Sequence, residues 1–187
     1  MAALARTPSA LGYLAGFVEA TQGDVMDLQA VRHVITGCTA VVSVIGRKRD
    51  SPIDLMTVAA VNMVTAMRET HVERLVVLSN TAVEDAHDRP SLAHRVIRGI
   101  LPRMNSSLVR DSLAAARVVA DSNLDWTIVR APLLTDGPRT GKYHVGPLTG
   151  DIPVRVSRAD VAEFVLACVL EGKSSRESPA IGSSGFI

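Results

Sequence analysis

Short apolar runs alternate with helix-length amphipathic segments along the whole chain, and this alternation limits the possible folds more than any other feature of the sequence. The apolar runs predict strands at 2–5, 17–20, 40–44, 75–78, 126–130 and 154–156. The segments between them predict helices at 28–35, 53–69 and 108–121, and a shorter helix between Pro90 and Pro102. Strands that are apolar on both sides indicate a parallel sheet covered by helices on both faces, which is a doubly wound α/β fold.

Residues suited to helix ends support these boundaries. Asp27 can cap the first helix and Gly37 can close it. Ser157 can cap a last helix that Gly172 ends, and Asp160 at the third helical position completes a capping-box pattern. On the helix at 53–69, the expected buried side consists of Val58, Val61, Met63, Val64 and Met67.

Composition and charge exclude several classes of protein. A length of 187 residues favours one domain, 1–187, and 20 basic against 19 acidic side chains leave no basic surface that would favour a nucleic-acid partner. No apolar run reaches the roughly 18 residues that span a bilayer, and no signal-peptide pattern is found, so we expect no membrane partner and a cytoplasmic location. The histidines lack metal-ligand spacing, so no metal site is predicted. Cys38 and Cys168 are expected to be buried thiols, and His94 and His144 to be solvated.

Polar residues at the ends of the predicted strands are candidates for ligand binding, because parallel α/β sheets bind ligands at the carboxyl ends of their strands. Arg6, with Thr7 and Ser9, can hold a phosphate monoester through a guanidinium group and two hydroxyls. Gly46 ends the strand at 40–44, where either strand termination or close approach of a ligand explains a glycine. The basic cluster at 47–49 fits either a solvated loop or contact with an anionic ligand.

The order and spacing of several motifs resemble a known family. They are Gly-Asp-Val-Met-Asp at 23–27, Ala-Val-Val-Ser with a following Gly at 40–46, Val-Glu-Arg-Leu-Val-Val-Leu-Ser at 72–79, Leu-Asp-Trp-Thr-Ile-Val-Arg-Ala-Pro at 124–132, Asp-Gly-Pro-Arg-Thr-Gly-Lys-Tyr at 136–143 and Ser-Arg-Ala-Asp-Val-Ala at 157–162. Together they resemble the atypical short-chain dehydrogenases/reductases, and within them the NAD(P)H-binding, NmrA-like branch that contains flavin/biliverdin-IXβ reductase. The resemblance runs from about residue 2 to residue 182.

This resemblance implies a Rossmann fold, a nicotinamide cofactor along the strand ends and hydride transfer to a flat conjugated acceptor such as a flavin. Arg6 would read the 2′-phosphate, which favours NADPH over NADH. The other positions that the resemblance implies are Asp24 and Val25 at the adenine, Ile45 and Gly46 at the ribose and pyrophosphate, Ser79 and Asn80 near the nicotinamide as candidate catalytic residues, and Ala131, Pro132 and Leu133 between the nicotinamide and the acceptor.

The sequence departs from the family at its catalytic positions. Neither Tyr13 nor Tyr143 has a lysine four residues later, so the Tyr-x-x-x-Lys proton donor of ordinary short-chain dehydrogenases is missing. Asn80 stands where the reductase branch tends to carry a serine, and Leu133 stands where a histidine sometimes follows the proline. A conjugated acceptor that solvent can protonate fits these positions better than a simple ketone does.

The family also begins with a strand, a glycine-rich turn and a helix that this sequence does not contain before its first strand. The missing strand is normally central, between the family's second and fourth strands. Losing about four buried aliphatic side chains would remove on the order of 6–12 kcal/mol of stabilisation. We therefore expect a start about 30 residues upstream or a truncated product. Exchange of an element between two copies is a third explanation.

Three hypotheses of function follow. The first is an NADPH-dependent reductase of a flavin or a similar conjugated small molecule. The second is a non-catalytic, dinucleotide-responsive regulator of the NmrA-like type, which the missing Tyr-Lys pair favours. The third is a truncated chain that binds no cofactor. The sequence leaves the electron acceptor and the oligomeric state open.

Overall fold

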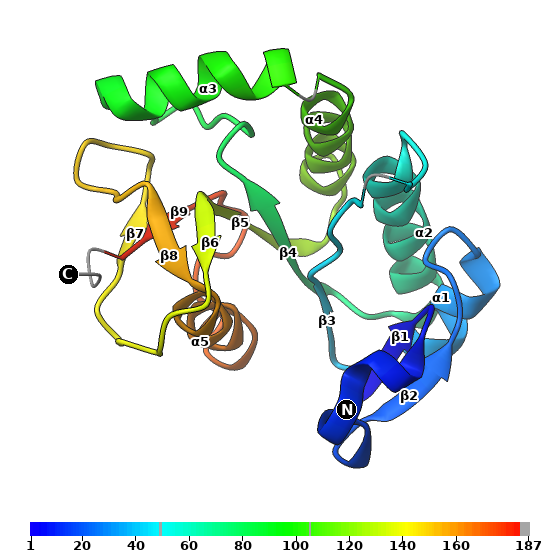
Figure 1. Ribbon diagram of the computed structural model, residues 1–187. Helices are drawn as coiled ribbons and strands as arrows, with labels where there is room; N and C mark the ends of the chain where they lie inside the picture. The colour runs from blue at the N-terminus through cyan, green and yellow to red at the C-terminus, as the bar shows by residue number, and fades with distance from the viewer. Residues whose placement is uncertain (49, 105, 184–187) are drawn as a thin grey trace.

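The computed structural model describes residues 1–48, 50–104 and 106–183, and Figure 1 shows how its elements are arranged. The strands are β1 (Ala2–Ala5), β2 (Glu19–Gln22), β3 (Ala40–Ser43), β4 (Arg74–Asn80), β5 (Asp125–Ala131), β6 (Leu133–Thr135), β7 (His144–Gly146), β8 (Arg155–Ser157) and β9 (Ala180–Gly182). The helices are α1 (Leu28–Ile35), α2 (Leu55–Thr70), α3 (Leu92–Met104), α4 (Ser106–Ala120) and α5 (Arg158–Leu170), with a 3₁₀ segment, η1, at Pro8–Gly16.

The main sheet has the strand order β3-β4-β5-β9-β7. Strands β3, β4, β5 and β9 are parallel, and β7 pairs antiparallel with β9 at the edge. Its longest ladder joins β4 to β5, from Arg74 opposite Asp125 to Asn80 opposite Ala131. Two smaller parallel sheets pair β1 with β2 and β6 with β8. The predicted α/β fold with a predominantly parallel sheet is confirmed.

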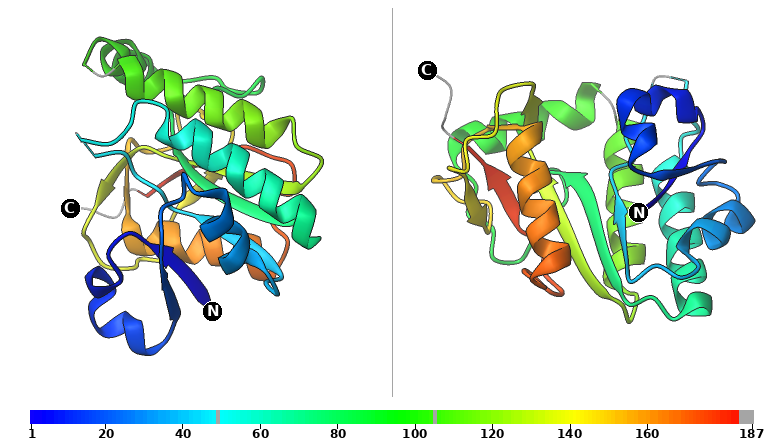
Figure 2. Two further views of the ribbon diagram at one scale, coloured as in Figure 1. Left: turned by 90° about the vertical axis from the view of Figure 1, so that its right-hand side faces the viewer. Right: turned by 90° about the horizontal axis from the view of Figure 1, so that it is seen from below.

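Helices cover both faces of the main sheet, as Figure 2 shows. On one face, Leu75 of β4 and Ile128 of β5 pack against α1, α2 and α4 in the larger apolar core. On the other, Val76 and Val129, the next residues along the same two strands, pack against α5. Because successive side chains of a strand point to opposite faces, the apolar runs at 75–78 and 126–130 supply both cores at once.

The β1–β2 pair is separate from the main sheet. Within the described residues, no ladder joins either strand to β3, so one edge of β1 and one edge of β3 are unpaired. Leu4 nevertheless packs against the larger core. Gly23 allows this approach, because a Cβ atom there would lie 2.8 Å from Leu4 Cδ1 and 3.0 Å from Ala30 Cβ. The break lies between the two strands that, in the family, flank the first strand.

Several predicted boundaries were wrong. The strand predicted at 17–20 runs from Glu19 to Gln22, because its register is set by pairing with β1 while η1 ends at Gly16 and leaves Phe17 exposed. Val61 is 45% exposed, since the buried side of α2 follows Ala60, Met63, Val64 and Met67 instead. Helix α3 extends two residues past Pro102. The sequence did not predict β6, β7 and β9, because strands of three residues give no periodic signal.

The N-terminus of α2 is capped by a carboxylate from another helix. Asp111 of α4 is buried and accepts hydrogen bonds from the backbone N–H of Met56 at 2.9 Å and of Thr57 at 3.0 Å, and from the Thr57 hydroxyl at 2.7 Å. Its position ties α2 to α4, the two helices that pack together on this face. The carboxylate therefore serves both the helix end and the packing of two helices.

We predict that Asp111→Ala lowers the free energy of unfolding by about 1–3 kcal/mol, because the buried N–H groups of Met56 and Thr57 lose their acceptor. Urea unfolding followed by circular dichroism measures this. Asp121→Ala is the matched control, since Asp121 is an exposed residue that follows the last turn of the same helix. Equal stability of the two variants would contradict the capping role.

Candidate cofactor site

The carboxyl ends of β4 and β5 bring five of the predicted site residues together. In the ladder between these strands, Ser79 lies opposite Arg130 and Asn80 opposite Ala131. Pro132 and Leu133 follow Ala131 directly, and Leu133 is 61% exposed. The sheet therefore places one hydroxyl and one amide beside an apolar segment that is open to solvent.

The two candidate catalytic residues differ in how their side chains are used. The Asn80 amide donates to the Ser112 hydroxyl at 3.0 Å, and its oxygen accepts from the Ala82 N–H at 2.9 Å. These contacts fix the turn after β4 and connect it to α4. Ser79 is half-buried, and its hydroxyl makes no hydrogen bond to any residue that the structure describes. Ser79 is thus the polar group that remains available to a ligand at this strand end.

The residues expected at the adenine and the 2′-phosphate lie on the separate β1–β2 pair. Arg6, Thr7 and Ser9 are exposed just after β1. Asp24 follows β2, and one of its carboxylate oxygens accepts from the Met26 N–H at 2.9 Å in a local turn. The Val25 carbonyl accepts from Asn62 of α2 at 2.9 Å, which fixes this turn against the helix. The group is accessible but lies across the break from β3.

The end of β3 lies between these two groups in the chain. Ile45 packs against the larger core, whereas Gly46 is exposed. A Cβ atom at Gly46 would meet no other residue within 4 Å, so packing within the protein does not require a glycine there. The open space beside the backbone is compatible with the approach of a ligand.

The helix N-termini that face the sheet ends are filled by the protein's own side chains. Asp27 accepts from the Gln29 N–H at 2.8 Å at the start of α1, as predicted, and Asp111 caps α2. Ser157 accepts from the Asp160 N–H at 3.0 Å at the start of α5. The N-termini of α1, α2 and α5 are therefore each capped by a side chain of the protein itself.

A buried ion pair supports the segment that follows β4. Arg130 is fully buried and binds Asp88 through two nitrogens at 2.7 and 2.8 Å. The same guanidinium donates to the Val83 carbonyl at 2.9 Å and to the Ser178 carbonyl at 2.5 Å, and Asp88 also accepts from the Leu148 N–H at 2.8 Å. Three loops are thereby fixed around the end of β5. Asp88 carried no sequence signal, because it lies in the irregular region between β4 and α3.

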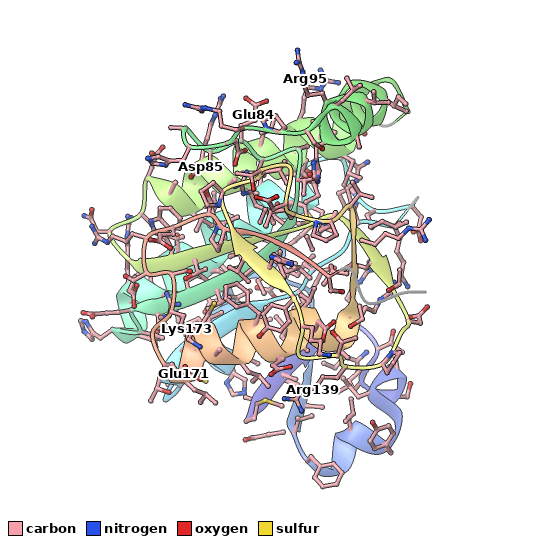
Figure 3. The ribbon with its side chains drawn as sticks, turned by 90° about the vertical axis from the view of Figure 1, so that its left-hand side faces the viewer. Glu84, Asp85, Arg95, Arg139, Glu171 and Lys173 are labelled. Atoms are coloured by element: carbon pink, nitrogen blue, oxygen red, sulfur yellow. The ribbon has the colours of Figure 1, made fainter. Side chains whose placement is uncertain are left out.

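Two other acidic groups organise loops near the same edge. Burial by itself raises the pKa of Asp160, but hydrogen bonds from the Thr140 N–H and hydroxyl and from the Gly141 N–H outweigh burial, so the pKa is lowered. The pKa of Asp85 is lowered for similar reasons. Burial raises it, but hydrogen bonds from His87 and Ser178 lower it by more. Figure 3 shows Asp85 on the loop after β4, and Arg139 and Lys173 toward the two ends of α5.

Tyr143 packs its ring edge-on against Phe164 with 6.2 Å between the ring centroids. Partial burial and the negative charge of Glu163 raise the pKa of Tyr143, so its phenol stays protonated at neutral pH. Glu163 is itself paired with Arg139, which donates two hydrogen bonds to its carboxylate at 2.6 and 2.8 Å.

A pocket of about 480 Å³ lies elsewhere, between α4, β5 and the segment 82–84. Its walls are largely apolar and include Val109, Leu113, Trp126 and Ile128. None of the predicted cofactor-binding residues lines it. This pocket is therefore distinct from the expected site at the strand ends.

The cysteines and histidines only partly match expectation. Cys168 is buried, and burial raises the pKa of its thiol to about 11, whereas Cys38 is only half-buried. His94 is buried at the start of α3 with Nδ1 2.7 Å from the Ser91 hydroxyl, so the prediction that it is solvated was wrong. His144 is exposed, as predicted. Among the described residues, no cluster of His, Cys, Asp or Glu could hold a metal, and no helix is long and apolar enough to cross a bilayer.

The strand order and the polar strand ends define a Rossmann-like nucleotide-binding protein. Residues 1–171 match the family described as NAD(P)H-binding, and the chain belongs to that family.

Several solved structures share this fold. One is the oxidoreductase ylbE from Lactococcus lactis, at 18% identity and a TM-score of 0.78, covering 98% of this chain and 79% of that one. Another is a short-chain dehydrogenase/reductase from Veillonella parvula in complex with NADP, at 19% identity and a TM-score of 0.73, covering 96% and 77%. The third is ChuY, an anaerobilin reductase from Escherichia coli, at 18% identity and a TM-score of 0.78, covering 100% and 85%.

We predict that Arg130→Met destabilises the protein by roughly 3–5 kcal/mol, because it leaves the Asp88 carboxylate buried without its cation. Arg158→Met is the matched control: its partner Asp136 is 91% exposed, and exposed pairs contribute about 0–1 kcal/mol. Urea unfolding of both variants gives the comparison. If the double variant Arg130→Met, Asp88→Leu is no more stable than Arg130→Met alone, the loss of the Arg130 charge beside Asp88 is not the cause.

We also predict a pH dependence from Asp160. Its pKa is lower in the folded protein than the ordinary value of 3.8, so the carboxylate stabilises the fold above that value and loses this effect as the pH falls through the folded pKa. Wild-type protein should therefore exceed Asp160→Asn in stability at pH ~6, and the difference should shrink steadily below pH ~4. Chemical unfolding across this range tests it; a constant difference would mean that the charge of Asp160 is irrelevant.

Proposed function

We propose that the protein binds NADPH along the carboxyl ends of its strands and reduces a flat conjugated small molecule, such as a flavin or a linear tetrapyrrole. The observation that carries the proposal is the β4–β5 ladder, which places the free hydroxyl of Ser79 beside Ala131 and the open apolar segment at Pro132 and Leu133. Membership of the NAD(P)H-binding family supports the cofactor, and the fold shared with an anaerobilin reductase supports the substrate class.

The chemistry requires little from the protein. NADPH would deliver a hydride, with its two electrons, to the conjugated acceptor, and solvent would deliver the proton that completes the reduced product. Ser79 would donate a hydrogen bond to the acceptor or to the nicotinamide amide, and the apolar segment would hold the acceptor's ring system flat. Asn80 would act by positioning the turn, since its amide already binds Ser112 and Ala82.

The remaining assignments belong to the same proposal. Asp24 and Val25 would contact the adenine, Ile45 and Gly46 the ribose and pyrophosphate, and Arg6 with Thr7 and Ser9 the 2′-phosphate. The exposure of Arg6, Thr7 and Ser9 at one strand end supports this, and the preference for NADPH over NADH rests on Arg6.

A second candidate is a dinucleotide-responsive regulator without catalysis. The structural use of the Asn80 amide favours it, because the side chain of one of the two candidate catalytic residues already binds Ser112 and Ala82. The two functions differ in a single property: the regulator binds NADPH but does not oxidise it when flavins or bilins are added.

We predict that the folded protein binds NADPH and oxidises it in the presence of FMN, FAD or biliverdin. Ser79→Ala should lower kcat roughly tenfold or more, because a hydrogen bond to developing charge is lost, while the Kd for NADPH changes little. Calorimetry gives the Kd and NADPH absorbance gives the rate. Ser106→Ala, which removes an exposed hydroxyl at the start of α4, is the matched control. A folded sample that does not bind NADPH would refute the proposal, and binding without acceptor-dependent oxidation would favour the regulator.

A further inference from the structure

Arg47 combines partial burial with an incomplete set of partners. It follows Gly46 at the end of β3, and Nη1 donates to the Ser107 hydroxyl of α4 at 3.1 Å. Within the described residues this is the only hydrogen bond of its side chain. A guanidinium carries five N–H donors in a rigid fork, so most of the donors of Arg47 are held in place without a protein acceptor.

No other arginine of the described chain has this combination. Five arginines form ion pairs with carboxylates: Arg32 with Glu69, Arg74 with Asp125, Arg130 with Asp88, Arg139 with Glu163 and Arg158 with Asp136. Apart from Arg47, the remaining arginines whose side chains are described are exposed. A partly buried cation without a counter-charge is unfavourable, which indicates that an anion from outside the described chain pairs with it.

The surroundings of Arg47 restrict what this anion is. Gly46, directly before it, leaves its backbone open, and Lys48, directly after it, forms no ion pair with a described residue. The nearby N-terminus of α2 is unavailable, because the Asp111 carboxylate occupies it. Among the described residues, the cations next to Gly46 in the chain that could bind an anion there are Arg47 and Lys48.

We propose that Arg47 binds the pyrophosphate of the nicotinamide cofactor through the guanidinium donors that Ser107 does not use. The inference rests on the proposed function. Arg47 lies in the segment that follows β3, between the adenine-side residues and Ser79 of β4 in chain order, and this is where the phosphates of a dinucleotide that spans both groups would lie. Arg6 lies on the separate β1–β2 pair and would contact only the 2′-phosphate.

The roles of Arg47 and Arg6 can be distinguished with ligands that share the pyrophosphate but differ in whether they carry a 2′-phosphate. We expect Arg47→Ala to weaken NADPH, NADH and ADP binding by a similar factor, about tenfold to a hundredfold, as for loss of hydrogen bonds to a charged group. Arg6→Ala should weaken NADPH alone. Arg68→Ala, an exposed and unpaired arginine of α2, should change none of them. Isothermal titration calorimetry gives each Kd, and thermal unfolding confirms that the variants are folded.

The outcomes separate this inference from the proposed function. If wild-type protein binds both cofactors and Arg47→Ala binds them equally well, the role of Arg47 is refuted while the proposed function stands. A loss confined to NADPH would assign Arg47 to the 2′-phosphate and would also overturn the inference. If NADPH fails to bind but ADP binds in an Arg47-dependent way, the anion site stands and the proposed function falls. Absence of both NADPH and ADP binding refutes both.

Discussion

The parallel ladder between β4 and β5 is the interaction on which the rest of the structure depends. It pairs seven consecutive residues on each strand, and alternate side chains along it fill the core under α1, α2 and α4 and the core under α5. The same register fixes where the two strands end. Ser79 and Asn80 therefore lie beside Ala131 because of backbone pairing in the interior, and no loop has to fold correctly for these residues to meet.

Buried carboxylates then position the segments that the ladder does not reach. Asp111 binds the start of α2, Asp160 binds the loop at 140–141, and Asp88 binds both Arg130 and the Leu148 N–H. In each case a charge is compensated by N–H donors from a distant part of the chain, so the energetic penalty of leaving it unpaired keeps the loop in place. These three carboxylates thus bind backbone N–H groups of the protein itself.

The sequence predicted those features that depend on local pattern. Apolar runs located β1, β3, β4 and β5 within a few residues, and the caps at Asp27 and Ser157 formed as expected because a cap involves only neighbouring backbone. Features that depend on distant partners were missed. Nothing near Asp88 or Asp111 in the sequence identifies Arg130 or the start of α2 as a partner, and the three-residue strands β6, β7 and β9 exist only through their neighbours. The role of each predicted site residue stays a prediction, because exposure at a strand end permits binding without specifying it.

The proposed cofactor contacts lie on both sides of the break between β1 and β3. A dinucleotide that contacts both Arg6 and Ser79 must cross from one sheet to the other, and β3 with Gly46 and Arg47 forms the near edge of that crossing. A ligand that contacts both the β1–β2 sheet and the main sheet stabilises their arrangement, and the stabilisation grows with its affinity. If the proposed cofactor contacts both sheets, its binding and the cohesion of the two sheets would form one linked equilibrium, and Arg47 would gain a counter-charge in the bound state.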